Sequence, residues 1–106
     1  MTGNYTEIIE IIVPATAAAG ETVNVEVKVL NLYSGPNDIT VTGNVNGLTL
    51  HFGGVYHTVP AGSIQSFYDA FIMPDRSVRV YAWSWYWGDN AWQVVGEGDD
   101  EAYVDI

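Results

Sequence analysis

The sequence predicts an all-β protein, an antiparallel β-sandwich of about seven to nine short strands. Apolar and polar residues alternate in several segments, turn-forming residues recur roughly every 8–12 positions, and no segment has helical periodicity. The clearest alternation lies in residues 22–31, T-V-N-V-E-V-K-V-L-N, where valines occupy one face and mostly polar residues the other. This pattern is typical of a strand with one face on a core and one in water. We expect all 106 residues to form one domain.

Proline and glycine predict where the elements before residues 22–31 end. Residues 5–13 should form a first strand, which ends at Pro14 because proline has no N–H to donate to a strand ladder. The small residues at 15–20 are too few for a stable helix, so they form a connection.

The rest of the chain is predicted as short strands joined by turns. Residues 34–38, S-G-P-N-D, are a turn cluster. Asn46-Gly47 is the strongest hairpin signal, because both central positions of a type I′ turn need positive φ. Gly88-Asp89-Asn90 marks a later turn, which precedes an acidic loop at 96–100. Besides the aromatic segment described next, strands are expected at residues 40–45, 48–52, 55–59, 63–73, 91–95 and 102–106.

Residues 78–92, V-R-V-Y-A-W-S-W-Y-W-G-D-N-A-W, hold all four tryptophans of the chain. Side chains of a strand alternate between its two faces. One face therefore carries Tyr81, Trp83, Trp85 and Trp87, and the other carries Val78, Val80, Ala82, Ser84 and Tyr86. Because both faces are largely apolar, we expect a central strand that is covered on both sides. Trp83, at the middle of this strand, is expected in the core.

The composition limits the possible partners. Thirteen acidic and three basic residues give a formal net charge of −10. Phosphate binding depends on Lys and Arg, so we expect no nucleic acid partner and no binding to anionic membrane surfaces. A solvated, self-repelling surface and a preference for basic partners both remain open. No segment approaches the ~20 apolar residues that span a bilayer, so no membrane insertion is expected, and the lack of cysteine excludes disulfides.

Two segments resemble a known family. Residues 14–31, P-A-T-A-A-A-G-E-T-V-N-V-E-V-K-V-L-N, and residues 59–74, V-P-A-G-S-I-Q-S-F-Y-D-A-F-I-M-P, are similar to bacterial and archaeal immunoglobulin-like adhesion domains of the CARDB type. The resemblance implies an immunoglobulin-like sandwich and a non-catalytic module of the kind common in surface or virion proteins. It assigns no ligand residues, and the tryptophan-rich segment at 78–92 departs from the family's usual pattern.

The aromatic residues near the end of this segment are the main candidates for function. Flat aromatic rings stack on sugars or fill a partner's pocket, and Trp and Tyr are favoured at interfaces. Trp85, Trp87 and Trp92 could instead belong to the core, so both interpretations stay open. The candidate residues for binding a protein partner or a glycan are Trp85, Tyr86, Trp87, Asp89, Asn90 and Trp92.

Other chemistry has weaker support. Glu97, Asp99 and Asp100 could offer oxygen ligands to Ca²⁺, but their spacing fits no EF-hand loop. His51 and His57 flank a glycine pair and could face each other, which is a weak metal signal without further ligands. No hydrolase, zinc-protease or phosphate-loop motif is present, so we expect no enzyme and no cofactor.

The sequence therefore predicts a non-enzymatic structural or interaction module of a virion or another extracellular surface. It would act in decoration, adhesion or assembly, through a protein partner or through self-assembly. The alternative is a carbohydrate-binding module that uses the exposed Trp and Tyr residues near the Gly88-Asp89-Asn90 turn.

Overall fold

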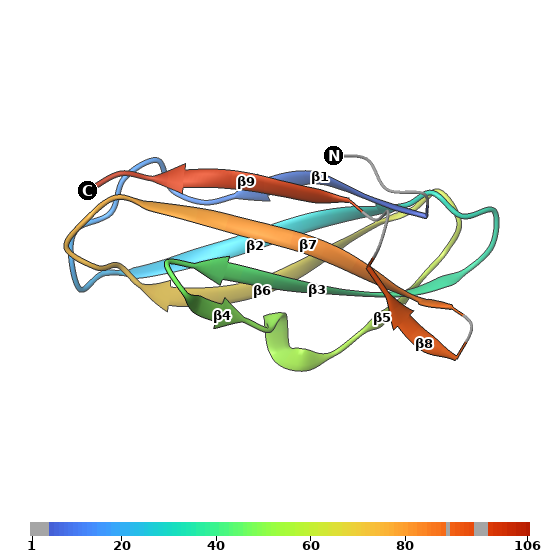
Figure 1. Ribbon diagram of the computed structural model, residues 1–106. Coiled ribbons are helices and arrows are strands. Elements are labelled where there is room, and N and C mark those ends of the chain that lie inside the picture. Colours follow the sequence, from blue (N-terminus) through green and yellow to red (C-terminus); the bar gives the residue numbers. More distant parts are fainter. Residues whose placement is uncertain (1–4, 89, 95–97) are drawn as a thin grey trace.

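The computed structural model describes residues 5–88, 90–94 and 98–106, and these form two antiparallel sheets packed face to face (Figure 1). The strands are β1 (Thr6–Ile12), β2 (Thr22–Asn31), β3 (Asn37–Val45), β4 (Leu48–Leu50), β5 (His57–Val59), β6 (Ile64–Ile72), β7 (Val78–Gly88), β8 (Ala91–Gln93) and β9 (Asp99–Val104). One sheet has the order β1-β2-β6. The other has the order β4-β3-β7-β8, with β5 also paired to β3 and β9 to β7. The predicted all-β sandwich is confirmed.

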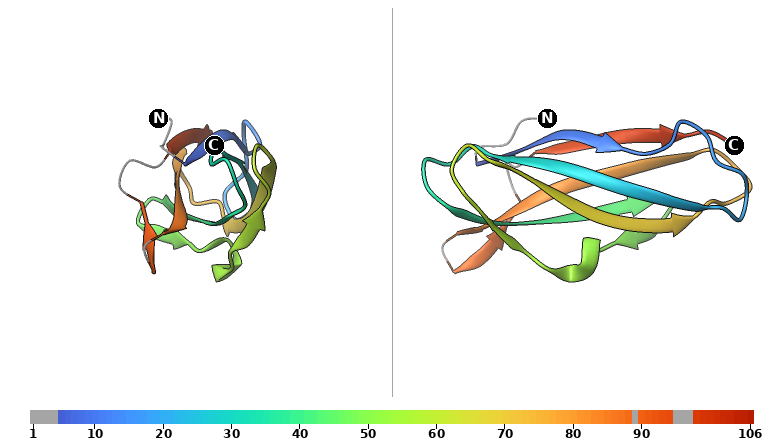
Figure 2. Two further views of the ribbon diagram at one scale, coloured as in Figure 1. Left: turned by 90° about the vertical axis from the view of Figure 1, so that its right-hand side faces the viewer. Right: turned by 180° about the vertical axis from the view of Figure 1, so that it is seen from behind.

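The sandwich is elongated, with extents of 43 × 22 × 20 Å, and an end-on view shows the two layers around a common core (Figure 2). The inner faces of the sheets fill the space between them. The alternating strand β2 contributes a row of valines that are at most 1% exposed, as its sequence pattern predicts. The other large buried side chains include Ile39, Val41, Phe67, Phe71, Met73, Val80 and Val104.

The aromatic strand β7 is central in its sheet, as predicted. It pairs with β3 along one edge, and with β9 and then β8 along the other. Its core-facing side is made of small residues: Val78, Val80, Ala82 and Ser84 are all buried. Only this side is covered by the domain's own core; the opposite face lies on the outside of the sandwich, where Trp87 is 44% exposed, and its predicted cover by something else stays a prediction.

The prediction that Trp83 belongs to the core is wrong. Trp83 lies opposite Thr42 of β3 and Asp99 of β9 on the outer face, and it is only half-buried. Packed sheets are separated by about 10 Å, and the valines and phenylalanines of the facing sheet already occupy that gap. The alternation of β7 therefore places its small side chains inside and its large rings outside.

Several strand boundaries differ from those predicted, each for a local reason. The hairpin at Asn46-Gly47 is confirmed, since both residues have positive φ and join β3 to β4. The strand after it stops early, because residues 52–54 form a 3₁₀ turn, and β5 begins at His57. The last strand begins at Asp99 instead of residue 102, because β7 extends far enough to pair with it. β8 ends at Gln93, and residue 95 of the predicted return strand lies outside the described residues.

Along one flank, the two sheets are joined by β1 of one sheet and β9 of the other, which run side by side in Figure 1. After Pro14 the backbone leaves β1, and Thr16 pairs in parallel with Asp105 beyond β9. At the opposite end of β1, the buried hydroxyls of Thr6 and Ser84 form a hydrogen bond of 2.7 Å between the sheets. The Ser84 hydroxyl also donates to the carbonyl of Gly98 at 3.1 Å. A polar pair thus links the sheets inside an otherwise apolar layer.

Replacing Ser84 by alanine should lower the free energy of unfolding by about 1–2 kcal/mol, because both hydrogen bonds of a buried hydroxyl are lost. Urea unfolding followed by circular dichroism measures this. Ser34→Ala, in an exposed turn, is the matched control and should change stability by less than about 0.5 kcal/mol. Equal values for the two variants would contradict a structural role for the pair.

Candidate functional site

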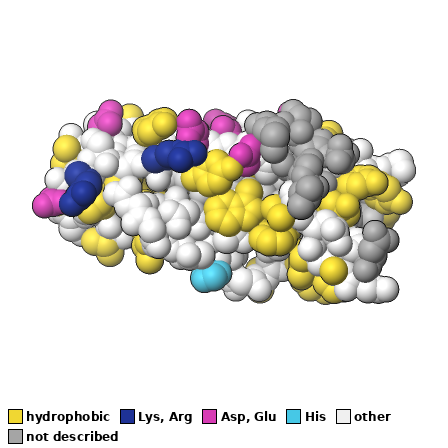
Figure 3. All heavy atoms as spheres, viewed as in Figure 1, with side chains coloured by type: hydrophobic (Ala, Val, Ile, Leu, Met, Phe, Trp, Pro, Cys, Tyr) yellow, Lys and Arg dark blue, Asp and Glu magenta, His cyan; other side chains and the backbone are white. Residues whose placement is uncertain are grey.

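The outer face of the sheet around β7 carries a row of aromatic side chains, named here the aromatic face. It consists of Tyr81, Trp83, Trp85 and Trp87 of β7 and Trp92 of β8. Trp92 joins the row because it pairs directly with Trp87. Figure 3 views this side of the molecule and shows hydrophobic side chains gathered along its middle, with acidic and basic groups beside them.

Polar side chains on both neighbouring strands border the aromatic face. On the β3 side, Thr42 accepts a hydrogen bond of 2.9 Å from the indole Nε1 of Trp85. On the β9 side, Asp99 accepts a hydrogen bond from the hydroxyl of Tyr81. Tyr81 in turn packs against Trp83, with ring centroids 5.6 Å apart. These contacts hold the rings in fixed positions while leaving them partly open to solvent.

An ion pair lies at the β9 end of the aromatic face. The guanidinium of Arg79 lies 4.6 Å from the centroid of the Tyr81 ring and pairs with Glu101. The hydrogen bond between Tyr81 and Asp99 raises the pKa of Tyr81 and lowers the pKa of Asp99. The basic group here is therefore already engaged with an acidic neighbour, and the border of the aromatic face is acidic.

The other end of the aromatic face is its most exposed part. Trp87 and Trp92 meet edge to face, with centroids 5.3 Å apart, and Tyr56 follows at 5.8 Å from Trp92. Tyr56 is 56% exposed and comes from the loop before β5. Two rings of the β7–β8 hairpin and one from a distant loop thus form an exposed cluster, and sequence reasoning missed Tyr56.

The predicted binding residues divide between the two sides of β7. Trp85, Trp87 and Trp92 do lie together on the aromatic face. Tyr86 points the other way, to the open end of the sandwich, where its ring lies 4.7 Å from that of Tyr5. Asn90 is exposed in the β7–β8 turn with φ of 61°, and Asp89 lies outside the described residues.

The Ca²⁺ candidates do not come together. Asp99 and Asp100 are consecutive in β9, so their carboxylates point to opposite faces of the sheet. Asp99 is engaged with Tyr81, and Asp100 accepts a hydrogen bond from the backbone N–H of Glu101. Glu97 lies outside the described residues. Among the residues that are described, no group of three or more His, Cys, Asp or Glu side chains could hold a metal ion.

The remaining titratable candidates have structural contacts. The His57 ring packs edge-on against Phe67 at 5.3 Å, and His51 is exposed just before the 3₁₀ turn. Asp69 of β6 is half-buried and accepts a hydrogen bond of 3.0 Å from the backbone N–H of Phe52. This bond holds the 3₁₀ turn against β6. In the described part of the chain, no helix is long and apolar enough to cross a membrane.

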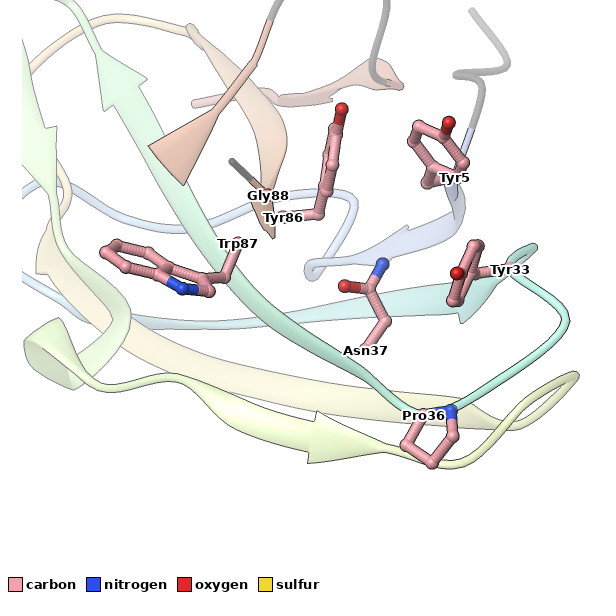
Figure 4. A pocket seen from close by; sticks show the side chains of 7 residues that line it. All are labelled: Tyr5, Tyr33, Pro36, Asn37, Tyr86, Trp87 and Gly88. Atoms are coloured by element: carbon pink, nitrogen blue, oxygen red, sulfur yellow. The ribbon is translucent and has the colours of Figure 1, made fainter. Parts of the chain in front are cut away.

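A second site, which sequence reasoning missed, lies at the open end of the sandwich and is named here the end cleft. It has a volume of about 290 Å³ and is lined by Tyr5, Tyr33, Pro36, Asn37, Tyr86, Trp87 and Gly88. Figure 4 shows three tyrosine rings grouped on one side and the Asn37 amide directed toward them, while the Trp87 indole points away. The lining comes from separate segments that only the fold brings together.

A buried asparagine shapes one wall of the end cleft. Asn31, only 1% exposed, donates from Nδ2 to the carbonyls of Val59 at 2.9 Å and Gly35 at 3.0 Å. Its Oδ1 accepts a hydrogen bond of 2.9 Å from the backbone N–H of Tyr33. One side chain thus ties the β2–β3 loop to the end of β5 and fixes the position of Tyr33. No sequence motif marked this residue, although it ends the alternating strand where a core residue is expected.

The architecture is an immunoglobulin-like β-sandwich, and its fold is similar to that of a solved CARDB domain, in line with the sequence resemblance. The CARDB domain of a Pyrococcus furiosus protein, solved in complex with di-metal ions, superposes with a TM-score of 0.63 and 17% identity. That match covers 98% of this chain and 92% of the other.

A second solved structure shares the fold. The alkylpurine DNA glycosylase AlkC of Pseudomonas fluorescens, bound to DNA containing an abasic site analogue, matches with a TM-score of 0.61 and 14% identity. The match covers 96% of this chain but only 31% of the glycosylase, so the chain spans about a third of that protein. No family model and no curated protein matches the sequence. The likeness therefore shows the fold alone.

The Tyr81–Asp99 hydrogen bond predicts a pH dependence. The folded-state pKa of Asp99 lies below the ordinary value of 3.8, so its contribution to stability is present above that pH and lost as the pH falls through the folded value. The pKa of Tyr81 lies above 10.0, so its contribution is present below that pH and lost at higher alkalinity. Tyr81→Phe should therefore cost about 1 kcal/mol near neutral pH, and this difference should vanish in strong acid.

Urea unfolding of the wild type and of Tyr81→Phe across the acid range tests this prediction. Tyr68→Phe on the opposite sheet, where the ring is 65% exposed, is the control and should show no such pH-dependent difference. A stability difference between Tyr81→Phe and the wild type that stays constant below pH 3.8 would contradict the assignment.

Proposed function

We propose that this protein is a non-enzymatic interaction module of a virion or cell surface, and that its aromatic face binds a protein partner. The observation that carries the proposal is the placement of the tryptophans. Three lie on the outer face of the central strand β7, and the fourth, Trp92 of β8, packs against Trp87; all four are partly open to solvent instead of in the core. Clustered Trp, Tyr and Arg side chains of this kind are the usual energetic centres of protein interfaces.

Charge limits the chemistry of the partner. Asp99 and Glu101 border the aromatic face, and the chain carries a net charge of −10. A partner with a neutral or basic surface around an apolar centre fits this border. A second copy would bring two strongly acidic surfaces together, so self-assembly would need high salt to screen the repulsion. We therefore favour a different protein as the partner.

Ligands of the two structural neighbours are not extended to this chain. DNA binding would need free basic groups, whereas Arg79 is paired with Glu101 and the net charge is strongly negative. A metal site would need converging carboxylates, whereas Asp99 and Asp100 diverge.

A glycan is the second candidate ligand for the outer surface. Trp87, Trp92 and Tyr56 form an exposed cluster beside the β7–β8 turn, where Asn90 offers an amide. Sugar rings stack on such aromatic faces through their C–H groups. A glycan array with no hits, or unchanged binding in Trp87→Ala, would remove this candidate.

The partner proposal predicts that Trp85→Ala weakens binding to the native surface at least tenfold, because it removes the central ring of the aromatic face. Cosedimentation of the purified protein with intact virions or cells from its source, stripped of the native protein, measures binding. Tyr68→Ala, which removes an exposed ring from the opposite sheet, is the matched control and should bind as the wild type does.

Both variants should show the wild-type circular dichroism spectrum, since neither ring belongs to the core. Equal binding by Trp85→Ala and Tyr68→Ala would refute the proposal. If light scattering detects a dimer of the wild type, and Trp85→Ala loses both this dimer and binding, the partner is a second copy of the chain.

A further inference from the structure

We propose that the end cleft binds a single ring of a neutral sugar. This site adjoins the aromatic face at Trp87, and its ligand does not depend on the protein partner proposed above. Four observations carry the inference: the chemistry of the lining, a buried amide that has no hydrogen-bond partner among the described residues, the size of the space, and the way in which the rings are held.

The described residues that line the end cleft are mostly aromatic and carry no charge. None of its seven residues is acidic or basic, although the chain has sixteen charged residues, thirteen acidic and three basic. Anionic ligands have no basic group to pair with here and are repelled by the net charge of −10. The rings of Tyr5, Tyr33 and Tyr86 offer faces for C–H groups, and the Tyr33 hydroxyl can form a hydrogen bond with a ligand. A neutral ring that carries many hydroxyl groups satisfies both requirements.

The side chain of Asn37 supplies the second observation. Asn37 is 8% exposed, its amide is directed into the end cleft toward the tyrosines, and no residue of the described chain forms a hydrogen bond with that amide (Figure 4). Buried amides are nearly always paired, because an unpaired one loses its hydrogen bonds to water without replacement. An amide can donate to one sugar hydroxyl and accept from another. Functional sites commonly keep such a group at the expense of stability.

The volume limits the ligand to one ring. Small-molecule sites usually begin near about 300 Å³, and the end cleft, at about 290 Å³, lies at that lower limit. It is open at the end of the sandwich, so further sugars of a chain could continue into solvent. The expected ligand is therefore a terminal neutral sugar, and a free monosaccharide should bind only weakly.

The rings that would contact the sugar are held in advance. Tyr5 packs against Tyr33 and Tyr86, with centroids 5.5 and 4.7 Å apart. The Tyr86 ring lies so close to Gly88 that a Cβ added there would be 2.6 Å from Cε2 of that ring. Glycine at 88 therefore permits the observed orientation of Tyr86. Preorganised rings bind a ligand without the cost of ordering them first.

Saturation-transfer NMR with glucose, galactose, mannose and N-acetylglucosamine, followed by a glycan array, tests the proposal on the full chain. We expect a neutral sugar to bind, with affinity reduced at least tenfold in Tyr33→Ala and Asn37→Leu. Gly88→Ala should also weaken binding, because Tyr86 must move. Tyr68→Ala and Trp85→Ala should bind the sugar as the wild type does, which separates this proposal from the one for the aromatic face.

Stability provides a readout that does not depend on the ligand. Because the Asn37 amide has no partner within the described residues, Asn37→Leu should fold and unfold at a temperature no lower than the wild type. Three results would overturn the proposal. They are no binding of any neutral sugar by the folded wild type, wild-type affinity for the sugar in both Asn37→Leu and Tyr33→Ala, or binding of choline in place of sugars, which would mark a cation site.

Discussion

The narrow space between the two sheets determines how the rest of the molecule is arranged. The facing sheet fills this space with the β2 valines and with Phe67, Phe71 and Met73, so a strand opposite them can insert only small side chains. β7 meets that requirement with Val78, Val80 and Ala82, and strict alternation then leaves its tryptophans outside. The aromatic face is thus a direct consequence of core packing. A register shift of one residue would force four large rings into a gap with no room for them.

Sequence patterns predicted the elements whose signals are local. Alternation located β2, and Asn46-Gly47 located the hairpin between β3 and β4. The central position of β7 also followed from its two apolar faces. Which face of β7 enters the core could not be predicted in this way. Hydrophobicity favours burial of Trp over Ala and Ser, whereas the limited volume between the sheets admits only the small side chains. That volume is set by residues of the other sheet, which no pattern within β7 reveals.

The end cleft could not be predicted for a different reason. Tyr5 precedes β1, Tyr33 lies in the β2–β3 loop, and Tyr86 is near the end of β7, so only the strand order places them together. Asn31 fixes this arrangement through hydrogen bonds to backbone groups of two separate turns. An asparagine that ends an alternating strand resembles any turn residue in sequence. Its role becomes visible only when its partners are known.

The two proposed sites meet at the end of β7 without competing for space. Tyr86 and Trp87 are neighbours in a strand, so their rings point to opposite faces. The Trp87 indole joins Trp92 on the aromatic face, while Tyr86 joins Tyr5 in the end cleft (Figure 4). A protein bound across the flat face therefore leaves the opening at the end of the sandwich accessible. Because β7 carries rings of both proposed sites, the two proposals do not exclude each other.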